Sequence, residues 1–311
     1  MSPNYGGNRF IRVRGMKKRF QKVAVLMGGP SSEWEISVRT GRAVVEGLRQ
    51  AGYTVVPVEF RDRNVPLPEG VEAVFIALHG EFGEDGQVQA FLRARGIPYT
   101  GSDPKASADS FDKLRCKAVL KKAGIPTPAW EVLRAGGVRT LPLPVVTKPP
   151  RQGSSFGIAV ARSEAAFPKA MAVSLAYDPE VLVEAFVPGR ELTVGLVDGE
   201  ALPAIEIVPN GGFYGFEQKY TKGETRYEVP APISAACEAR CRELALATNR
   251  ALGCRGLGRV DIRMNPQGEL FVLEMNTIPG FTDTSLLPKA AAAAGIGFSA
   301  LCARVMETAA L

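Results

Sequence analysis

Hydrophobic and polar positions near the start of the chain predict a parallel β/α arrangement. An apolar run at residues 22–27 ends at Gly28-Gly29, as expected of a buried strand that leads into a tight loop. Apolar residues then recur at helical spacing from Val38 to Ala51, and residues 54–58 and 73–78 have the composition of two further strands. This order predicts a doubly wound parallel sheet whose ligands lie beyond the carboxyl ends of its strands.

Polar and apolar residues alternate in a predicted hairpin near the C-terminus, with strands at 259–264 and 269–276 joined by an Asn-Pro-Gln-Gly turn. If the loop consists of these four residues, Asp261 and Glu274 are diagonal cross-strand neighbours whose carboxylates reach one shared ion. A loop of odd length would instead move the residues of one strand to the opposite face. The alternation places Arg259, Asp261, Val272 and Glu274 on one face and Val260, Ile262, Phe271 and Leu273 on the other.

The polar face of this hairpin carries a candidate metal site. The carboxylates of Asp261 and Glu274 and the amide of Asn276, with no His or Cys nearby, form an all-oxygen ligand set. Such a set suits Mg²⁺ carried with a nucleotide better than zinc. Arg259 stands one alternation before Asp261, where a fixed cation can meet phosphoryl or oxyanion charge. The alternative is an ordinary hairpin with a solvated polar face.

The segments between these regions predict helices, strands and two functional loops. Residues 106–123 have the pattern of a helix, and a proline-containing turn after it marks a domain boundary. A Gly/Ser loop at 149–157, with Lys148 beside it, can direct backbone N–H groups and an ammonium at phosphates, or it is a plain hairpin turn. Residues 209–230 are long enough for a lid. Further strands are predicted at 144–148, 158–161 and 181–187, and further helices at 234–252, from 289 and from 298.

Several single residues at the ends of predicted elements have two interpretations. Glu33 opens the first helix, where it either receives an ammonium group or complements the helix dipole. His79 ends a strand, where a structural role is more common than a catalytic one. Ser285 and Leu286 can present a hydroxyl and a backbone N–H to an anion at a helix start, or Ser285 is an ordinary cap.

Composition narrows the class of protein. The chain has 311 residues, of which 46% are hydrophobic and 23% charged, which is typical of a soluble globular enzyme with two or three domains. No apolar run approaches the length of a membrane span. The five cysteines suit a reducing cytoplasm, and a single histidine argues against a zinc site. A P-loop motif is absent, and no G-x-G-x-x-G opens a helix.

The net charge of +6 arises from the first residues of the chain. Residues 1–22 contain seven Lys and Arg side chains and no acid, so the remainder has a formal charge of −1. A near-neutral body argues against a nucleic-acid-binding face. We expect residues 1–21 to form a solvated, disordered tail without the features of a secretory signal, and Met16 is an alternative start.

Short motifs follow one another in a characteristic order along residues 22–311. They read G-G-P-S-S-E-x-E-I-S, L-H-G-x-x-G-E-D-G, D-K, K-P-x-R-x-G-S-S-x-G, V-E-x-x-x-x-G-R-E, K-Y, G-R-V-D and E-M-N-T-I-P-G-F-T. This series resembles that of bacterial D-alanine:D-alanine ligases of the ATP-grasp superfamily, and matches at this density are highly specific.

The resemblance implies a fold of mixed α/β and α+β class. An N-terminal doubly wound domain at 22–108 would be followed by two ATP-grasp subdomains at 109–186 and 187–311. It also implies a reaction, in which ATP phosphorylates the carboxylate of one D-alanine and the amine of a second attacks the acyl phosphate. ATP would be a co-substrate and Mg²⁺ or Mn²⁺, as two ions, the cofactor. The protein would be a cytoplasmic homodimer in peptidoglycan precursor synthesis, without membrane or nucleic-acid partners.

The resemblance further implies a role for individual residues of the chain. The positions that match metal ligands are Asp261, Glu274 and Asn276. Those that match ATP contacts are Lys113, Lys148, Glu184, Val187, Glu191 and Lys219. Those that match catalytic or D-alanine-binding groups are Glu33, His79, Ser154, Tyr220, Arg259, Gly280, Ser285 and Leu286.

Other positions depart from the family pattern without removing a charged catalytic group: Trp34, Pro168, Gly215, Gln218 and Thr284. Pro168 is expected to interrupt a helix after Ser163. Two other functions remain open, namely another ATP-grasp ligase, such as one that makes a D-alanine:D-lactate ester, and a non-catalytic nucleotide-binding protein. Because Tyr220 follows Lys219, as in the peptide-forming type, D-alanine is the expected nucleophile.

Overall fold

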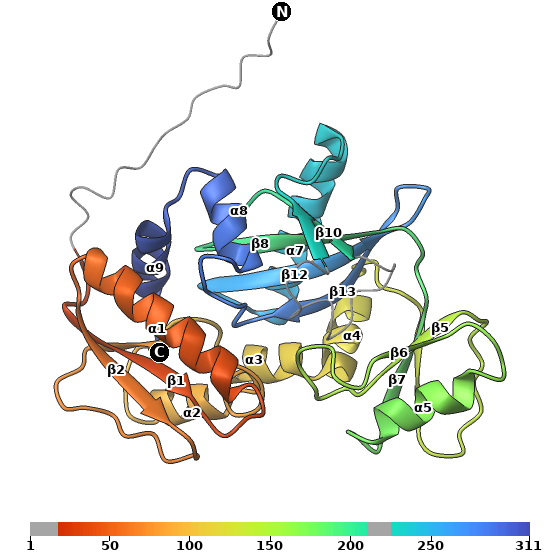
Figure 1. The fold of residues 1–311 in the computed structure, drawn as a ribbon, viewed down its shortest axis with the longest axis horizontal. Coiled ribbons are helices and arrows are strands. Elements are labelled where there is room, and N and C mark those ends of the chain that lie inside the picture. Colours follow the sequence, from red (N-terminus) through yellow and green to blue (C-terminus); the bar gives the residue numbers. More distant parts are fainter. Residues whose placement is uncertain (1–17, 210–224) are drawn as a thin grey trace, which may run out of the picture.

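A computed structural model describes residues 18–209 and 225–311 (Figure 1). Lys219, Tyr220, Gly215, Gln218 and most of the expected lid lie outside these residues. In the described ranges the strands form a three-stranded parallel sheet, a four-stranded antiparallel sheet and a six-stranded antiparallel sheet. In the three-stranded sheet, β1 (Lys22–Gly28) lies between β2 (Thr54–Phe60) and β3 (Ala73–Ile76).

Both faces of the three-stranded sheet are covered. The helices α1 (Trp34–Gln50) and α9 (Phe298–Glu307) pack on the face to which Val23 belongs, and α2 (Gln87–Arg93) packs with Ala24 on the other. Burial on both faces explains why the first strand is a continuous apolar run rather than an alternating one. The doubly wound arrangement predicted from the sequence is confirmed.

The four-stranded sheet has the order β4-β7-β5-β6, and α5 (Phe167–Leu175) packs on it at one end of the molecule (Figure 1). Pro168 lies in the first turn of α5, where a proline needs no N–H partner, so it begins this helix and the expected interruption is wrong. The strands are β4 (Trp130–Leu133), β5 (Val145–Lys148), β6 (Ala159–Ala161) and β7 (Val181–Ala185).

The six-stranded sheet packs on α7 (Ala235–Leu252). The Ser234 side chain accepts a hydrogen bond from the Cys237 N–H and caps this helix, as the sequence predicts. The strand order of the six-stranded sheet is β11-β10-β8-β12-β13, with β9 paired to β8. The strands are β8 (Arg190–Val197), β9 (Glu200–Ala201), β10 (Ile205–Pro209), β11 (Thr225–Glu228), β12 (Leu257–Met264) and β13 (Leu270–Asn276).

The β12–β13 hairpin brings Asp261 and Glu274 to one face of the sheet, as predicted, but in a different register. The two residues are directly opposite each other, and the expected diagonal relationship is wrong. Arg259 likewise lies opposite Asn276. Directly opposed residues are closer than diagonal ones, so the two carboxylates are better placed to share an ion than the sequence suggested.

A β-bulge in β13 also changes which residues face the core. The register shifts between Asp261 and Ile262, so that Ile262 pairs with Val272 and both are fully buried. The prediction that Val272 shares a face with Asp261 is therefore wrong, as is the placement of Phe271 and Leu273 on the core face. An extra residue in one strand reverses the alternation beyond it, and the sequence pattern does not reveal where it is inserted.

The predicted helix over 106–123 is two helices, α3 (Pro104–Phe111) and α4 (Lys113–Lys122). Asp112 has an extended conformation with ψ of 106°, and its carboxylate accepts hydrogen bonds from the N–H groups of Leu114 and Arg115. This aspartate therefore caps a new helix. Although the sequence places α4 in the 109–186 subdomain, it packs in the core with α7 and the six-stranded sheet.

The ordered fold begins before the expected end of the tail. The backbone N–H of Arg19 donates to the Glu307 carboxylate at 2.9 Å, and Phe20 is buried in the core with α1 and α9. The assignment of residues 18–21 to a disordered tail is thus wrong. The preceding residues lie outside the described part of the chain.

The last two helices are α8 (Leu286–Ala293) and α9. The first of them starts earlier than the sequence predicts, directly after Ser285. Within the described residues no single helix is long and apolar enough to cross a membrane, and α8 and α9 meet that criterion only when counted together across a 105° bend.

Candidate active site

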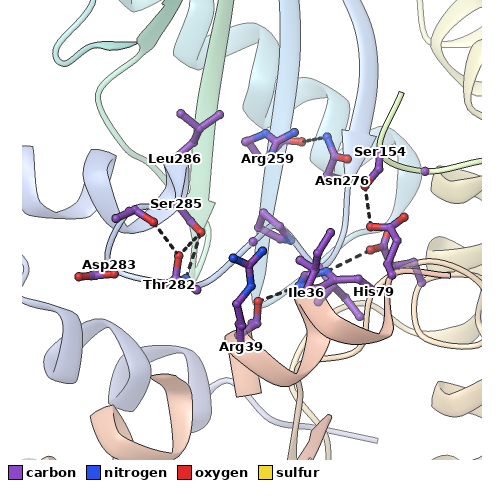
Figure 2. Close-up of a pocket in the computed structure, with 18 of the residues that line it drawn as sticks. Ile36, Arg39, His79, Ser154, Arg259, Asn276, Thr282, Asp283, Ser285 and Leu286 are labelled. Atoms are coloured by element: carbon purple, nitrogen blue, oxygen red, sulfur yellow. Dashed lines mark hydrogen bonds and ion pairs between the residues drawn. The ribbon is translucent and has the colours of Figure 1, made fainter. Parts of the chain in front are cut away.

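The first of two neighbouring cavities lies between the start of α1 and the start of α8, and we call it the α1–α8 cavity (Figure 2). It has a volume of about 540 Å³ and is mainly polar. All the described residues with a predicted catalytic or D-alanine-binding role line it, while Tyr220 lies outside the described residues. These lining residues are Glu33, His79, Ser154, Arg259, Gly280, Ser285 and Leu286.

Glu33 faces this cavity from the N-terminal end of α1. It is 9% exposed, and its carboxylate accepts a hydrogen bond of 2.6 Å from the Ser154 hydroxyl. Gly153 lies close beside it, and a Cβ there would be 2.5 Å from a Glu33 carboxylate oxygen, so a larger residue would displace this carboxylate. Ser154 is held in the left-handed region at φ of 48°. The 149–157 loop thus contacts Glu33 at the edge of the cavity. This position favours binding of a ligand by Glu33 over a role that is limited to complementing the dipole of α1.

His79 forms part of the cavity wall with both ring nitrogens engaged. Its Nε2 is 3.0 Å from the Thr40 hydroxyl, and its Nδ1 is 3.4 Å from the Glu84 carboxylate. The residue is 4% exposed. This arrangement favours the structural role that the sequence left open, with the ring shaping the cavity rather than moving a proton.

Ser285 occupies the N-cap position of α8 without acting as an ordinary cap. Its hydroxyl accepts a hydrogen bond from the Thr282 N–H at 3.0 Å and lies 2.8 Å from the Thr282 hydroxyl, and it makes no cap hydrogen bond to the first turn of α8 in the described structure (Figure 2). The first N–H groups of a helix carry partial positive charge. Ser285 and Leu286 therefore present to the cavity a helix start whose charge and free hydrogen-bond donors suit an anion.

Arg259 and Asn276 line this cavity from the β12–β13 hairpin, and both contact Asp261. Arg259 donates from Nε and Nη2 to the two carboxylate oxygens at 2.9 and 2.8 Å. The Asn276 amide donates to the same carboxylate at 3.0 Å, and Thr193 does so at 2.6 Å. Bidentate pairing fixes the guanidinium plane. Arg259 is therefore a preoriented cation on the wall of the cavity.

The same hairpin offers ligands for a divalent cation. The described residues contain no group of three or more His, Cys, Asp or Glu side chains that could hold a metal alone. Asp261 and Glu274 supply two carboxylates from directly opposed positions, and Asn276 supplies an amide. This all-oxygen set fits Mg²⁺, which characteristically takes one or two carboxylates and completes its shell with phosphate and water oxygens.

The second cavity, which we call the intersheet cleft, lies between the four-stranded and six-stranded sheets. Apolar side chains such as Val146 and Leu273 line it together with Asp261 and Glu274. Lys113 approaches from α4, where its ammonium is 3.6 Å from Glu274. Lys219 lies outside the described residues. The residues with predicted ATP contacts that line this cleft are Lys148, Glu184, Val187 and Glu191.

Lys117, to which the sequence motifs assign no role, lies beside the intersheet cleft. This residue is 1% exposed and forms an ion pair with Glu184, which also pairs with Lys148. Burial lowers the pKa of Lys117, and the neighbouring Lys148 adds to this effect. Burial would raise the pKa of Glu184, but the two ammonium groups outweigh it and lower the pKa. The available signal was spacing, because Lys117 follows Lys113 by one helical turn.

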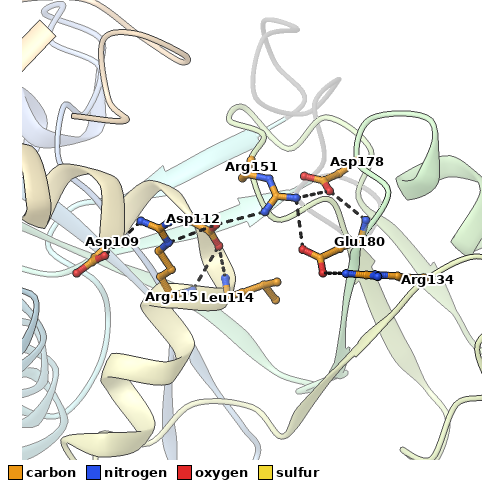
Figure 3. A network of polar contacts seen from close by, with 8 residues as sticks. All are labelled: Asp109, Asp112, Leu114, Arg115, Arg134, Arg151, Asp178 and Glu180. Carbon is orange, nitrogen blue, oxygen red and sulfur yellow. Dashed lines mark hydrogen bonds and ion pairs between the residues drawn. The ribbon is translucent and has the colours of Figure 1, made fainter. Parts of the chain in front are cut away.

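The 149–157 loop is anchored on its outer side by Arg151 (Figure 3). The guanidinium donates to Asp178 at 2.6 Å and lies 3.5 Å from both Asp112 and Glu180. Arg134 extends this network from the far side of Glu180. Since Asp178 is 5% exposed, the strongest of these contacts is shielded from water.

Two departures from the family pattern fit into the structure locally. Trp34 stacks against the Arg61 guanidinium, which lies 3.6 Å from the ring centroid. The Thr284 hydroxyl is 3.2 Å from that of Thr282, within the loop that leads into α8. Neither residue displaces a predicted ligand-binding group.

A doubly wound domain followed by two antiparallel sheets that enclose a cleft defines the ATP-grasp class of fold. Family models described as the D-Ala-D-Ala ligase N-terminus and C-terminus match residues 60–102 and 119–307. The chain belongs to the D-alanine–D-alanine ligase family.

Similar proteins of known name agree with this membership. The chain is 45% identical to the D-alanine–D-alanine ligase of Methylacidiphilum infernorum, over 92% of this chain and 94% of that protein. It is 44% identical to the enzyme of Citrifermentans bemidjiense, over 97% and 99%. A solved structure of the Bacillus anthracis ligase complexed with ATP has a TM-score of 0.82 at 32% identity, covering 93% and 97%. The VanG D-Ala:D-Ser ligase of Enterococcus faecalis has a TM-score of 0.81 at 28% identity, covering 92% and 98%.

Proposed function

We propose that this protein ligates two D-alanine molecules to D-alanyl-D-alanine through an acyl-phosphate intermediate, with ATP as co-substrate and ADP and phosphate as the other products. The observation that carries the proposal is that the two cavities share the β12–β13 hairpin. Arg259 and Asn276 line the α1–α8 cavity, while Asp261 and Glu274 line the intersheet cleft. A carboxylate in one cavity and a triphosphate in the other would therefore meet at a single group of fixed charges.

The first D-alanine would bind through opposite charges at its two ends. Its ammonium would lie against the Glu33 carboxylate, which Ser154 orients. Its carboxylate would then extend toward Arg259, which lines the same cavity. This orientation places the nucleophilic oxygens of the amino acid beside the hairpin that separates the two cavities.

The nucleotide would bind in the intersheet cleft, with its base between apolar side chains and its phosphates toward the hairpin. Lys148 and Lys113 would hold the phosphates, and Glu184, Val187 and Glu191 would contact the base and ribose. A divalent cation held by Asp261, Glu274 and Asn276 would neutralise phosphate oxygens and so favour phosphoryl transfer.

The second D-alanine would be oriented by the start of α8. Its carboxylate would accept hydrogen bonds from the Ser285 hydroxyl and the Leu286 N–H, and its amine would face the acyl phosphate. When the amine attacks, the carbonyl oxygen acquires negative charge, which the Arg259 guanidinium and the backbone near Gly280 would stabilise. Phosphate would then leave as the peptide bond forms, and it would accept the proton that the attacking amine loses. We further propose that Lys219 contacts the phosphates and that Tyr220 forms a hydrogen-bonded bridge with Ser154. The enzyme would use a second divalent ion and act as a cytoplasmic homodimer.

The test is a phosphate-release assay on the full chain with ATP, Mg²⁺ and D-alanine, with the product identified by mass spectrometry. We expect D-alanine-dependent release and D-alanyl-D-alanine as the main product. Parallel reactions with D-alanine plus D-lactate, and with D-alanine plus D-serine, test the acceptor. A depsipeptide as main product at neutral pH would overturn the choice of acceptor. Nucleotide binding without any D-alanine-dependent turnover would overturn the enzymatic role.

A further inference from the structure

Arg263 is a charged residue on the wall of the intersheet cleft to which the sequence motifs give no function. It follows Asp261 by one alternation on β12, so both side chains lie on the cleft side of the sheet. Its side chain is only 16% exposed. An arginine buried to this extent requires partners for its donors.

The guanidinium of Arg263 finds these partners in one short segment. Its Nε and Nη2 donate to the Val187 carbonyl at 3.2 and 3.0 Å, and Nη2 also donates to the Gly189 carbonyl at 2.9 Å. Its Nη1 is 3.2 Å from a Glu191 carboxylate oxygen. One planar fork thus binds two backbone carbonyls and a carboxylate at once.

Residues 186–189, which we call the linker, connect the two walls of the cleft. It runs from the end of β7 in the four-stranded sheet to the start of β8 in the six-stranded sheet. On the first side, the Phe186 N–H donates to the Pro144 carbonyl at 3.0 Å. On the second side, Arg263 holds the segment to β12. The linker is therefore attached to both sheets, and Arg263 makes the attachment to the six-stranded one.

The linker also passes very close to the hairpin at Gly189. A Cβ at this position would lie 2.2 Å from the Met264 carbonyl oxygen, and the residue has φ of 112°. Only glycine fits both conditions without strain. A close backbone approach and the Arg263 hydrogen bonds therefore restrict the same few peptides.

We propose that Arg263 is a positioning residue for the nucleotide, which fixes the 186–189 linker and the Glu191 carboxylate so that the base and ribose meet a preformed site. This inference rests on the proposed function in that the cleft takes ATP. Val187 and Glu191, which Arg263 holds directly, are the residues expected to contact the base and the ribose. Without the guanidinium, the linker peptides would reorient and nucleotide binding would have to order them.

The test compares Arg263→Met and Arg263→Lys with the wild-type chain. Isothermal titration with Mg-ADP measures nucleotide affinity, and steady-state kinetics give kcat and the KM values for ATP and D-alanine. We expect Arg263→Met to weaken ADP binding and raise the KM for ATP by roughly 10- to 100-fold, since hydrogen bonds to a charged donor are lost. Arg263→Lys should show an intermediate defect, because an ammonium keeps the charge but cannot reproduce the fork. The KM for D-alanine should change less than twofold, by this proposal.

Arg190→Met is the matched control. Arg190 neighbours Glu191 on β8, but its guanidinium pairs with Glu206 and the Pro232 carbonyl, outside the residues that line the cleft. Thermal unfolding of each variant reports loss of fold. Equal ADP affinities for Arg263→Met and Arg190→Met would overturn the inference, as would a parallel rise in the KM values for both substrates.

A second variant keeps the test decisive if Arg263→Met fails to fold. Gly189→Ala leaves the guanidinium intact and displaces the linker itself, and we expect the same selective loss of ADP affinity. Unchanged affinity in Gly189→Ala and Arg263→Lys together would overturn the inference. A wild-type chain that binds ADP but does not ligate D-alanine would contradict the proposed function and leave the role of Arg263 standing.

Discussion

The α1–α8 cavity and the intersheet cleft are built in different ways. The cavity is lined by helix ends and loops from distant parts of the chain, which contribute residues such as Glu33, Ser154 and Ser285. The cleft is walled by strand faces, whose side chains are placed by the hydrogen-bond ladders of two sheets. A strand-built site obtains its geometry from the backbone, whereas a loop-built site depends on individual side-chain contacts such as Ser154 to Glu33.

The two regions also differ in how their charged side chains are paired. In the cleft, Glu184 is 1% exposed and forms ion pairs with two lysines of the chain itself. In the cavity, Glu33 and Arg259 would meet the ammonium and the carboxylate of the first amino acid, and the start of α8 would meet the carboxylate of the second. Substitutions in the cleft should therefore affect stability and nucleotide binding, while those in the cavity should affect the amino-acid substrate.

The largest effect is expected from Glu184→Gln. This change leaves the ammonium groups of Lys117 and Lys148 together without their carboxylate, and breaking such a buried pair lowers the free energy of unfolding by about 3–5 kcal/mol. Urea denaturation at pH 7 measures it. Glu180→Gln, which removes a more exposed carboxylate from the rim of the Arg151 network, is the control and should lose far less. Equal losses would contradict the difference in charge compensation.

The same variant has a defined pH dependence. Because the pKa of Glu184 is lower in the folded chain, its carboxylate contributes stability at neutral pH. That contribution is lost as the pH falls from about 4.3, the ordinary pKa of glutamate, through the folded pKa. The difference between wild type and Glu184→Gln should thus shrink in acid. A difference that stays constant from pH 7 to pH 3 would show that the carboxylate charge is not the cause.

Glu274→Gln tests the hairpin that the two regions share. If these two opposed carboxylates bind a divalent cation as we propose, removing one should weaken binding of the cation and of the phosphates, and we expect kcat to fall by roughly 10²–10³-fold. Glu269→Gln, at an exposed position on the same hairpin, should retain wild-type turnover. Turnover by Glu274→Gln at the wild-type rate over a range of Mg²⁺ concentrations would exclude this role.

Glu33→Gln and Ser154→Ala separate the amino-acid cavity from the cleft. The KM for D-alanine at the first subsite should rise roughly 10- to 100-fold in Glu33→Gln, because an ammonium loses its charged partner. Ser154→Ala should have a smaller effect in the same direction. The KM for ATP should be nearly unchanged in Glu33→Gln. Glu35→Gln, in the first turn of the same helix but exposed, is the control.

The smallest effect is expected from Arg151→Ala, which loosens the loop that touches both regions. Gly153 and Ser154 line the cavity and Ser155 lines the cleft, so the KM values for both substrates should rise together, by roughly three- to tenfold. Arg134→Ala removes the outer, 76% exposed member of the same network and should have almost no effect (Figure 3). A rise in only one KM would show that the loop serves a single site.

Much of the fold and of the site could be predicted from local sequence. The run at 22–27, the capped helix after Ser234 and the hairpin near the C-terminus were predicted because periodicity and turn residues act over short distances. The common face of Asp261 and Glu274 also followed from alternation. The ordered motifs added the family, and with it the residues that the α1–α8 cavity and the cleft bring together.

Only the tertiary structure decided how distant segments meet. The Lys117–Glu184 pair and the hydrogen bonds of Arg263 to the 186–189 linker join residues far apart in the chain, and the bulge that turns Val272 inward is set within one hairpin by its packing on the core. Local propensity cannot specify such contacts, because a bulge position or a buried ion pair is selected by the free energy of packing two elements against each other. The sequence by itself determined which chemical groups this protein carries, and the packing of its sheets determined which of them face one another.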